Sequence, residues 1–415
     1  MYKYYKWLLI ALLSGAFFFH QADRALFGLL TVPIQDELKL TDVQIGWINT
    51  TLSWTLAAMT VVAGFLGDRF SRKWIITLSL ISWSLMTVGM GFIGGFAGAL
   101  FLRSIATGVG ESFYAPSAYA LIAAHHKETR SMALSIHQAA LYVGLMVSGI
   151  LVAWALGVFG SWRHVFVAFG VAGALLGVAF IFLLKEGKRE SAATATETKP
   201  SHTLKEGLLA YFANPSALCA TAGFVAIVFV NNAYLFWAPK FAQAKFALDA
   251  GAAGKGVMLY HHLFAFAAIL AGGFITDRFV KKYPRFRLGF QVVALLCGAP
   301  MLLWMGLSGS FTALLVAASL YGICRGCFEV NTHASLFDVI APAYRSTAVG
   351  LLNMIAFFFG GFSGIAMGAL SQRWGVRGFE IGFGIMSLTY VAGALLMLFS
   401  FLFTFKHNRV IETSP

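Results

Sequence analysis

The chain has 415 residues, of which 59% are hydrophobic and 11% are charged. A soluble domain carries roughly 25% charged residues, so this composition excludes a soluble protein and indicates a membrane protein with several spans. The formal net charge is +13 at pH 7, and the Lys and Arg residues fall in short segments between apolar stretches. That placement indicates contact with the membrane surface and not with a nucleic acid.

The first apolar stretch runs from Trp7 to Pro33 and carries two adjacent charges, Asp23 and Arg24. A span takes about 20 apolar residues, and charges inside it survive only when they face protein or a water-filled cavity. His20 lies three residues before Asp23 and four before Arg24, so the three side chains share one side of a helix. This pattern indicates a substrate or proton site, or alternatively a single ion pair that fixes helix packing.

Apolar segments recur along the whole chain and predict an all-α membrane protein with twelve transmembrane helices. A polar stretch rich in Ala, Thr, Glu and Lys separates the sixth segment from the seventh and cannot bury a core. We therefore expect a six-helix bundle at 1–185, a flexible cytoplasmic linker at 186–214 and a second six-helix bundle at 215–415. The predicted segments lie near 8–33, 44–66, 75–96, 97–123, 131–157, 163–184, 216–239, 253–276, 287–307, 311–337, 346–370 and 378–405.

Lys and Arg residues gather in alternate loops. The loops after the second, fourth and eighth predicted helices are basic, as are the linker and the C-terminal tail. The loop after the first helix is net acidic, and the loops after the third and ninth carry almost no charge. Because basic loops stay on the cytoplasmic side of a membrane, the pattern predicts that both termini are cytoplasmic.

A short internal repeat follows the second and the eighth predicted helices. Residues 64–73 read GFLGDRFSRK and residues 272–282 read GGFITDRFVKK, so both copies contain Gly-x-x-x-Asp-Arg-Phe followed by basic residues. Parallel repeats of six helices are typical of transporters with a central site between two bundles. The repeat therefore supports two related halves.

The fourth predicted helix carries a second set of charges. Arg103 and Glu111 are eight residues apart, which is roughly two turns, and Tyr114 follows them. A guanidinium group donates two parallel hydrogen bonds to a carboxylate or phosphate, and a nearby carboxyl group can gain or lose a proton as an arginine moves. We expect this pair to face Asp23 and Arg24 and to couple protons to anions, or alternatively to stabilise the bundle.

Other polar residues interrupt the apolar segments further along the chain. His137 and Gln138 lie in the fifth predicted helix, and an unperturbed His titrates near neutral pH. Amides near the middle of a span suit the hydroxyl groups of a sugar, although hydrogen bonds between helices explain them equally well. These residues are Asn231 and Asn232 in the seventh helix, Arg325, Glu329 and Asn331 in the tenth, and Asn353 in the eleventh.

The repeated Gly-x-x-x-Asp-Arg loop resembles motif A of the major facilitator superfamily, and the resemblance covers essentially the whole chain. Asp23-Arg24, with Arg103 and the Gly-x-Gly-Glu111 element, is similar to two groups within it. One comprises the anion:cation symporters, including sialin and bacterial sugar-acid permeases; the other comprises the Spinster transporters of lysolipids and sphingolipids. The resemblance implies gate contacts by the motif A residues Asp68, Arg69, Arg72, Asp277 and Arg278.

The segments that begin at Arg130 and Arg325 look more like the sugar-acid permeases. The leading hypothesis is a secondary active transporter that moves a small organic anion, a sugar acid, across the bacterial inner membrane. We expect it to act as a monomer coupled to protons, or to sodium. A Spinster-like lysolipid or sphingolipid transporter and a multidrug exporter are the alternatives. We assign proton coupling to Asp23, Glu111 and Glu329 and substrate binding to Arg24, Arg103, Tyr114, His137, Gln138, Asn231, Asn232, Arg325, Asn331 and Asn353.

The sequence gives no indication of an enzyme. It contains neither a Gly-x-x-x-x-Gly-Lys-Ser/Thr phosphate loop nor a His-Glu-x-x-His helix. The pair Cys324-x-x-Cys327 lacks a second pair, so we expect thiols that pack between helices and no metal. The expected partners are the substrate, the coupling ion and membrane lipids, with no cofactor.

Overall fold

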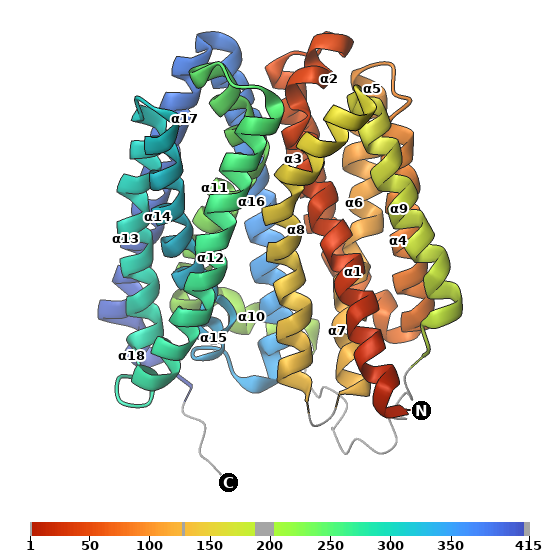
Figure 1. The fold of residues 1–415 in the computed structure, drawn as a ribbon. Coiled ribbons are helices and arrows are strands. Elements are labelled where there is room, and N and C mark those ends of the chain that lie inside the picture. Colours follow the sequence, from red (N-terminus) through yellow and green to blue (C-terminus); the bar gives the residue numbers. More distant parts are fainter. Residues whose placement is uncertain (1, 127–128, 187–202, 411–415) are drawn as a thin grey trace. The chain divides into compact units, whose positions relative to one another are not determined.

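The computed structural model describes residues 2–126, 129–186 and 203–410, and every regular element in these ranges is a helix. A helix pairs its backbone groups within one segment, which a membrane environment demands. The helices, in chain order, are α1 (Tyr2–Leu29), α2 (Thr31–Leu38), α3 (Asp42–Arg69), α4 (Arg72–Met90), α5 (Phe96–Ala99), the π-helix η1 (Leu100–Ala106), α6 (Thr107–Ser112), α7 (Tyr114–His125), α8 (Arg130–Phe159), α9 (Trp162–Leu183), α10 (Leu204–Phe212), α11 (Pro215–Phe246), α12 (Ala250–Val280), α13 (Phe286–Leu307), α14 (Phe311–Glu329), α15 (Thr332–Phe337), the 3-10 turn η2 (Pro342–Tyr344), α16 (Arg345–Trp374), α17 (Val376–Phe399), the π-helix η3 (Ser400–Thr404) and α18 (Phe405–Asn408) (Figure 1).

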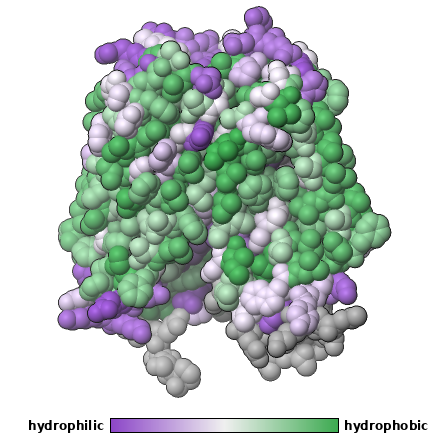
Figure 2. All heavy atoms as spheres, viewed as in Figure 1, coloured by the Kyte–Doolittle hydropathy of each residue, from purple (hydrophilic) through white to green (hydrophobic). Residues whose placement is uncertain are grey.

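Each predicted apolar segment coincides with a helix or a run of helices. Within the described ranges, nine of these stretches are long and apolar enough to cross a membrane by length and composition. Helix α1 is outside that set, and its middle carries the polar run from His20 to Arg24. On the face drawn in Figure 2, hydrophobic residues cover the middle of the surface and hydrophilic residues gather toward its two ends. The chain is therefore a multi-pass membrane protein, while the count of twelve spans stays a prediction.

The segment expected as a flexible linker, 186–214, contains a helix. Residues 187–202 lie outside the described ranges, but Leu204–Phe212 forms α10. The side chain of Thr203 accepts from the backbone N–H of Glu206, and the Glu206 carboxylate accepts from the backbone N–H of Thr203. This capping box satisfies two donors that a helix start leaves free. Part of the expected linker is therefore helical, and its role as a linker between two bundles stays a prediction.

The chain forms two compact units, and they combine segments that are distant in sequence. Unit 1 contains Met1–Glu190, Asn232–Leu259 and Gly361–Val376. Its helices α1 and α8 pack along each other, as do α4 and α9. Leu13, Trp83 and Tyr114 belong to its buried apolar core. Unit 1 therefore carries the first predicted bundle and also two stretches from the second half.

Unit 2 contains Ser191–Asn231, Tyr260–Gly360 and Arg377–Pro415. Its helices α13 and α14 pack along each other. Tyr321 and Tyr390 are buried in it, and the hydroxyl of Tyr390 donates to that of Tyr321 at 3.1 Å. The predicted boundary of the bundles at 186–214 stays a prediction.

Candidate functional site

A cluster of four charged side chains is buried in unit 1. Asp23 and Arg24 come from α1, Arg103 from η1 and Glu111 from α6. The side chains are 6%, 20%, 2% and 0% exposed, respectively. We call these four residues the charge cluster. Buried charges in a membrane helix are costly unless they are paired, and they mark functional sites by default.

Arg103 lies on a π-helical segment, where the helix is wider than a regular α-helix. The hydroxyl of Thr107 donates to the carbonyl of Leu102, five residues back, at 2.7 Å. Such π-segments occur often at functional sites because they change the direction of a few side chains. The hydroxyl of Ser104, next to Arg103, donates to the carbonyl of Ile48 at 2.6 Å and ties the segment to α3. The arginine is thus held on a locally irregular but anchored backbone.

Asp23 and Arg103 form the well-bonded half of the charge cluster. Arg103 Nη1 donates to Asp23 Oδ2 at 3.0 Å, and Arg103 Nη2 donates to the carbonyl oxygen of Arg24 at 3.1 Å. The hydroxyl of Thr87 donates to the other carboxylate oxygen of Asp23 at 2.8 Å. Both carboxylate oxygens therefore accept a hydrogen bond, so this pair has the geometry that a buried ion pair requires.

Arg24 and Glu111 form the loosely bonded half. The distance from Arg24 Nε to Glu111 Oε2 is 3.6 Å, and His20 Nε2 lies 3.6 Å from the same oxygen. Within the described residues, neither oxygen of Glu111 accepts a hydrogen bond, although both are buried. A buried carboxylate without donors is unfavourable, so this group responds strongly to any change in its neighbours.

Tyr114 and His137 lie in an aromatic layer of unit 1, and Tyr114 also lies beside His20. The hydroxyl of Tyr114 donates to the carbonyl of Leu13 at 2.6 Å, and its oxygen lies 3.1 Å from His137 Nε2. Since the hydroxyl has one proton, His137 Nε2–H is the donor in the second contact. The ring of Phe17 stacks on His137 at 4.5 Å, and both predicted site residues are fully buried. Their described contacts are those of a packed core.

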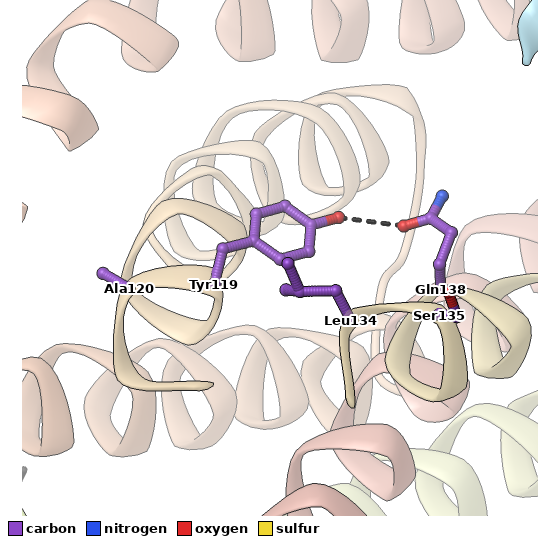
Figure 3. Close-up of a pocket in the computed structure, with 5 residues that line it drawn as sticks. All are labelled: Tyr119, Ala120, Leu134, Ser135 and Gln138. Carbon is purple, nitrogen blue, oxygen red and sulfur yellow. Dashed lines mark hydrogen bonds between the residues drawn. The ribbon is translucent and has the colours of Figure 1, made fainter. Parts of the chain in front are cut away.

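Gln138 lies at a hollow in the surface of unit 1. Figure 3 shows Tyr119 of α7 reaching toward Gln138 of α8, and the Tyr119 hydroxyl donates to Gln138 Oε1 at 3.0 Å. The hollow has a volume of about 440 Å³, and Ala120, Leu134 and Ser135 complete its lining. Of the predicted substrate ligands, Gln138 is thus one that borders open space.

Arg325, predicted as a ligand in the tenth helix, contacts His261, which is not among the predicted site residues. Arg325 Nη1 lies 3.1 Å from His261 Nε2, and Arg325 Nε lies 3.3 Å from Glu329 Oε2. His261 Nδ1 faces the carbonyl of Ala318 at 3.3 Å. Because that carbonyl needs a donor, Nδ1 carries the proton and Nε2 accepts from the arginine. The sequence does not indicate which of the neighbouring residues His261 and His262 faces Arg325.

The predicted amide ligands are divided between the two units. Asn232, in unit 1, donates to the hydroxyl of Ser53 at 3.1 Å. Asn331, in unit 2, donates to the hydroxyl of Thr276 at 3.1 Å. Asn231 and Asn353 are half-buried in unit 2. The first two are hydrogen bonds between helices, which was the alternative reading of these residues.

The structure leaves the motif A contacts as predictions. The side chains of Asp68 and Arg69 are outside the described part of the molecule. Arg72 Nη1 donates to the carbonyl of Ala120 at 3.3 Å, so this arginine joins α4 to α7. Asp277 and Arg278 are exposed at the end of α12.

A second polar group of unit 1 was not predicted at all. Asp42, at the start of α3, accepts from Gln35 Nε2 at 2.7 Å and from the hydroxyl of Ser371 at 2.5 Å, and it pairs with Lys240. Lys240 also donates to Gln35 Oε1 at 2.6 Å. We call these four residues the latch. It connects the ends of α2 and α3, near the acidic segment after α1, to residues of α11 and α16.

Close backbone contacts accompany the latch. A Cβ atom on Gly46 would lie 2.7 Å from the carbonyl oxygen of Gly364, and one on Gly364 would lie 2.8 Å from that of Gly46. The hydroxyl of Thr50 donates to the carbonyl of Gly361 at 2.8 Å. Small residues permit such approaches between membrane helices.

Comparison with known proteins places this arrangement in a family. A model of the Major Facilitator Superfamily matches residues 12–364. Protein spinster of Drosophila melanogaster is 24% identical over 389 residues, which are 88% of this chain and 62% of that protein. The "Probable galactarate/D-glucarate transporter" of Bacillus subtilis (strain 168) is 28% identical over 198 residues, which are 46% of this chain and 43% of that protein. The chain thus spans less than two thirds of the length of either relative.

A solved structure has the same fold. It is a bacterial homologue of the human lysosomal transporter Spinster, crystallised in an inward-facing and unoccupied conformation. The TM-score is 0.87 at 19% sequence identity, and the alignment covers 99% of both chains. At this identity the likeness concerns the fold.

Nine helices in the described ranges are long and apolar enough to cross a membrane, and the fold is shared with a solved transporter structure. The chain belongs to the Major Facilitator Superfamily. It is accordingly a transporter and not an enzyme.

Proposed function

We propose that this transporter moves a small organic anion, a sugar acid, by alternating access and couples its movement to protons. The observation that supports this is the unequal bonding of the two arginines in the charge cluster. Arg103 is held by Asp23 and by a backbone carbonyl, whereas Arg24 approaches Glu111 only at 3.6 Å and keeps 20% of its side chain exposed. Arg24 can therefore offer its guanidinium group to the carboxylate of a substrate.

Glu111 supplies the coupling in this proposal. Its carboxyl group can bind a proton, and Arg24 then loses the anion nearest to it. A guanidinium group in an apolar unit is costly without an anion, so the arginine would favour a bound substrate carboxylate. Proton and substrate would each raise the affinity for the other, which is the linkage that a symporter needs. Sodium in place of the proton is the alternative that the test below separates.

In this proposal the latch forms one gate of the transporter and the motif A loops form the other. The latch joins the acidic loop after α1 to segments 232–259 and 361–376, and we assign it to the non-cytoplasmic side. The gate contacts of Asp68, Arg69, Arg72, Asp277 and Arg278 would act on the cytoplasmic side. In this proposal the protein is a monomer in the bacterial inner membrane. It has twelve spans in two bundles, 1–185 and 215–415, and cytoplasmic termini.

Four other sequence-predicted ligands keep their proposed roles in this framework. Gln138 borders the hollow of unit 1, so it is placed to contact a hydroxylated substrate. We also assign substrate binding to Asn231, Asn353 and Arg325, which belong to unit 2. The relatives named above include a transporter named for galactarate and D-glucarate, which are dicarboxylated sugar acids and fit an arginine-containing site.

The test is uptake of labelled hexuronates and hexarates into proteoliposomes under an imposed pH gradient. Wild-type protein should concentrate the substrate, and Arg24→Ala should lose uptake. Glu111→Gln should lose gradient-driven uptake but retain exchange of labelled for unlabelled substrate. Uptake that follows a sodium gradient and ignores the pH gradient would contradict proton coupling. Concentrative uptake by Glu111→Gln would remove Glu111 as the proton carrier.

A Spinster-like lysolipid transporter is the second candidate, because the relation to protein spinster spans 88% of this chain. The two candidates differ in the ligand that should stabilise the purified protein. A rise in melting temperature with lysophospholipids, but not with carboxylated sugars, would favour the lipid. Screening both ligand classes on wild type and on Arg24→Ala separates them, since a sugar acid should depend on that guanidinium group far more than a lipid chain does.

A further inference from the structure

Four candidate membrane helices have one end at a hollow whose lining residues all belong to unit 2. The spans 286–307 and 342–374 begin there, and the spans 311–337 and 376–408 end there. The hollow has a volume of about 420 Å³. We call it the arginine pocket, and it is lined by Arg287, Ala334, Phe337, Asp338, Arg345, Arg409 and Val410.

The lining of the arginine pocket carries more positive than negative charge. Three arginines face one acid, Asp338, whose Oδ1 accepts from Arg287 Nη1 at 2.8 Å. Burial raises the pKa of the Asp338 carboxyl, and Arg287 opposes this rise. Within the described residues, the other oxygen of Asp338 is buried and accepts no hydrogen bond. The described residues of the lining therefore carry three guanidinium groups and one carboxylate.

The helix ends around the pocket add to its positive electrostatic potential. Arg345 is the first residue of α16, and Arg287 is the second residue of α13. A helix N-terminus carries a partial positive charge, so it disfavours a cation in its first turn and attracts an anion. Both of these arginines therefore stand where a helix favours the opposite charge. A bound anion would offset both the charge of the arginines and the partial positive charge of the helix N-termini.

Local contacts hold the arginines toward the pocket. Arg345 Nη2 donates to the carbonyl of Phe337 at 3.1 Å, and its guanidinium carbon lies 5.1 Å from the centre of the Phe337 ring. The backbone N–H of Val410 donates to the carbonyl of Asp338 at 2.9 Å and brings Arg409 alongside. The cationic groups come from three separate helix ends and converge on one space, as they do in sites for phosphate groups.

The depth of the pocket indicates where the anion comes from. Candidate spans begin or end at its lining residues, so the pocket lies at the level of the membrane surface, where phospholipid phosphates are found. We propose that the arginine pocket binds a phosphate group, carried either by an anionic phospholipid or by a free phosphate. The proposal does not depend on the transported substrate, because the residues involved differ from the charge cluster.

The test measures the melting temperature of the full-length protein in a neutral detergent at constant ionic strength. The probes are dihexanoyl phosphatidylglycerol, dihexanoyl phosphatidylcholine and inorganic phosphate, with chloride as the matched control. Saturable stabilisation by phosphatidylglycerol, but not by zwitterionic phosphatidylcholine, would support a lipid headgroup. Stabilisation by inorganic phosphate alone would support a free anion. No stabilisation by any phosphate beyond the chloride control would overturn the proposal.

Variants separate the pocket from general surface charge. Arg287→Gln and Arg345→Gln should each weaken binding of the stabilising probe about tenfold, since each loses charge-assisted hydrogen bonds. Asp338→Asn should tighten it, because this change removes the acid that the described residues contribute to the lining. The control Lys281→Gln makes the same charge change at an exposed position near the end of α12.

Two further outcomes would overturn the proposal. In the first, Lys281→Gln weakens binding as much as the arginine variants do. In the second, binding appears only after residues 411–415 are removed, which would mean that the chain's own tail fills the pocket in the intact protein.

Discussion

The two units bury their charges in different ways. In unit 1, two arginines and two carboxylates share one cluster, and the side chain of Glu111 is fully enclosed. In unit 2, Arg325 contacts a neutral His261 and the acid Glu329, whose side chain is 29% exposed. Water screens an exposed acid, whereas an enclosed one responds to each neighbouring charge. In the proposed mechanism, this difference assigns the proton-linked step to unit 1 and leaves Arg325 of unit 2 with a partner that solvent screens.

The largest effect should come from Arg103→Ala. This change leaves Asp23 as an uncompensated buried carboxylate, which destabilises a protein by about 3–5 kcal/mol. We expect loss of folded protein in detergent, read as loss of a monodisperse peak and of a cooperative thermal transition.

The matched control is Arg103→Ala combined with Asp23→Asn, which removes both charges together. This double variant should recover a large part of the stability. Equal instability of the single and double variants would show that Arg103 acts by packing and not by pairing.

The next effect sharpens the contrast between the two acids. Glu329→Gln should retain gradient-driven uptake, lowered by no more than about tenfold, because solvent already screens its pairing with Arg325. Glu111→Gln should lose that uptake, as proposed above. The measurement is the ratio of concentrative uptake to exchange in proteoliposomes for both variants. If Glu329→Gln also loses only the concentrative component, the coupling is shared and the contrast fails.

A smaller effect is expected at His261. His261→Leu removes the acceptor of Arg325 Nη1, and leaving a buried donor unsatisfied costs about 1–3 kcal/mol. The variant should melt at a lower temperature than wild type. His261→Gln can keep an acceptor and should lose less, so the order wild type, Gln, Leu is the result to check. A reversed order for the two variants would contradict the assigned direction of this hydrogen bond.

The smallest effect concerns an acid at the surface of unit 1. Hydrogen bonds from Arg163 and then from Trp162 lower the pKa of Glu37. A lowered folded-state pKa means that the pair stabilises the protein above the unfolded pKa and that this contribution is lost as pH falls through the folded pKa. Melting temperatures of wild type and Glu37→Gln should differ slightly at neutral pH and converge under acidic conditions. A difference that stays constant with pH would rule out this linkage.

The helices could be predicted from the sequence because apolar segments of sufficient length recur regularly. The charge cluster could be anticipated in part, since Asp23, Arg24, Arg103 and Glu111 stand out as charges in apolar helices. Which arginine pairs with which carboxylate could not be predicted, because helix periodicity gives the face of a residue but not the side chain that it contacts. His261 was missed for the same reason.

Two local features differ in how far the sequence could reveal them. The start of helix α10 has a sequence signal, the capping box Thr203-x-x-Glu206, although the composition of the segment indicates a flexible linker. The π-segment around Arg103 has no comparable signal, because one wider turn costs little and depends on its surroundings, such as the hydrogen bond from Ser104 to Ile48. A charged residue in an apolar helix can therefore be located along the chain well before its direction is known.

Gly46 and Gly364 bring two helix backbones into direct contact beside the latch. Two backbones that meet without side chains have no rotamers to readjust, so the contact cannot stretch gradually and separates within a short displacement. Under the proposed alternating access, we expect this contact to open within a short displacement. In the proposed alternating-access cycle, an alanine at either position would press a methyl group against a backbone carbonyl and favour the state in which the two helices are apart, with every charge unchanged.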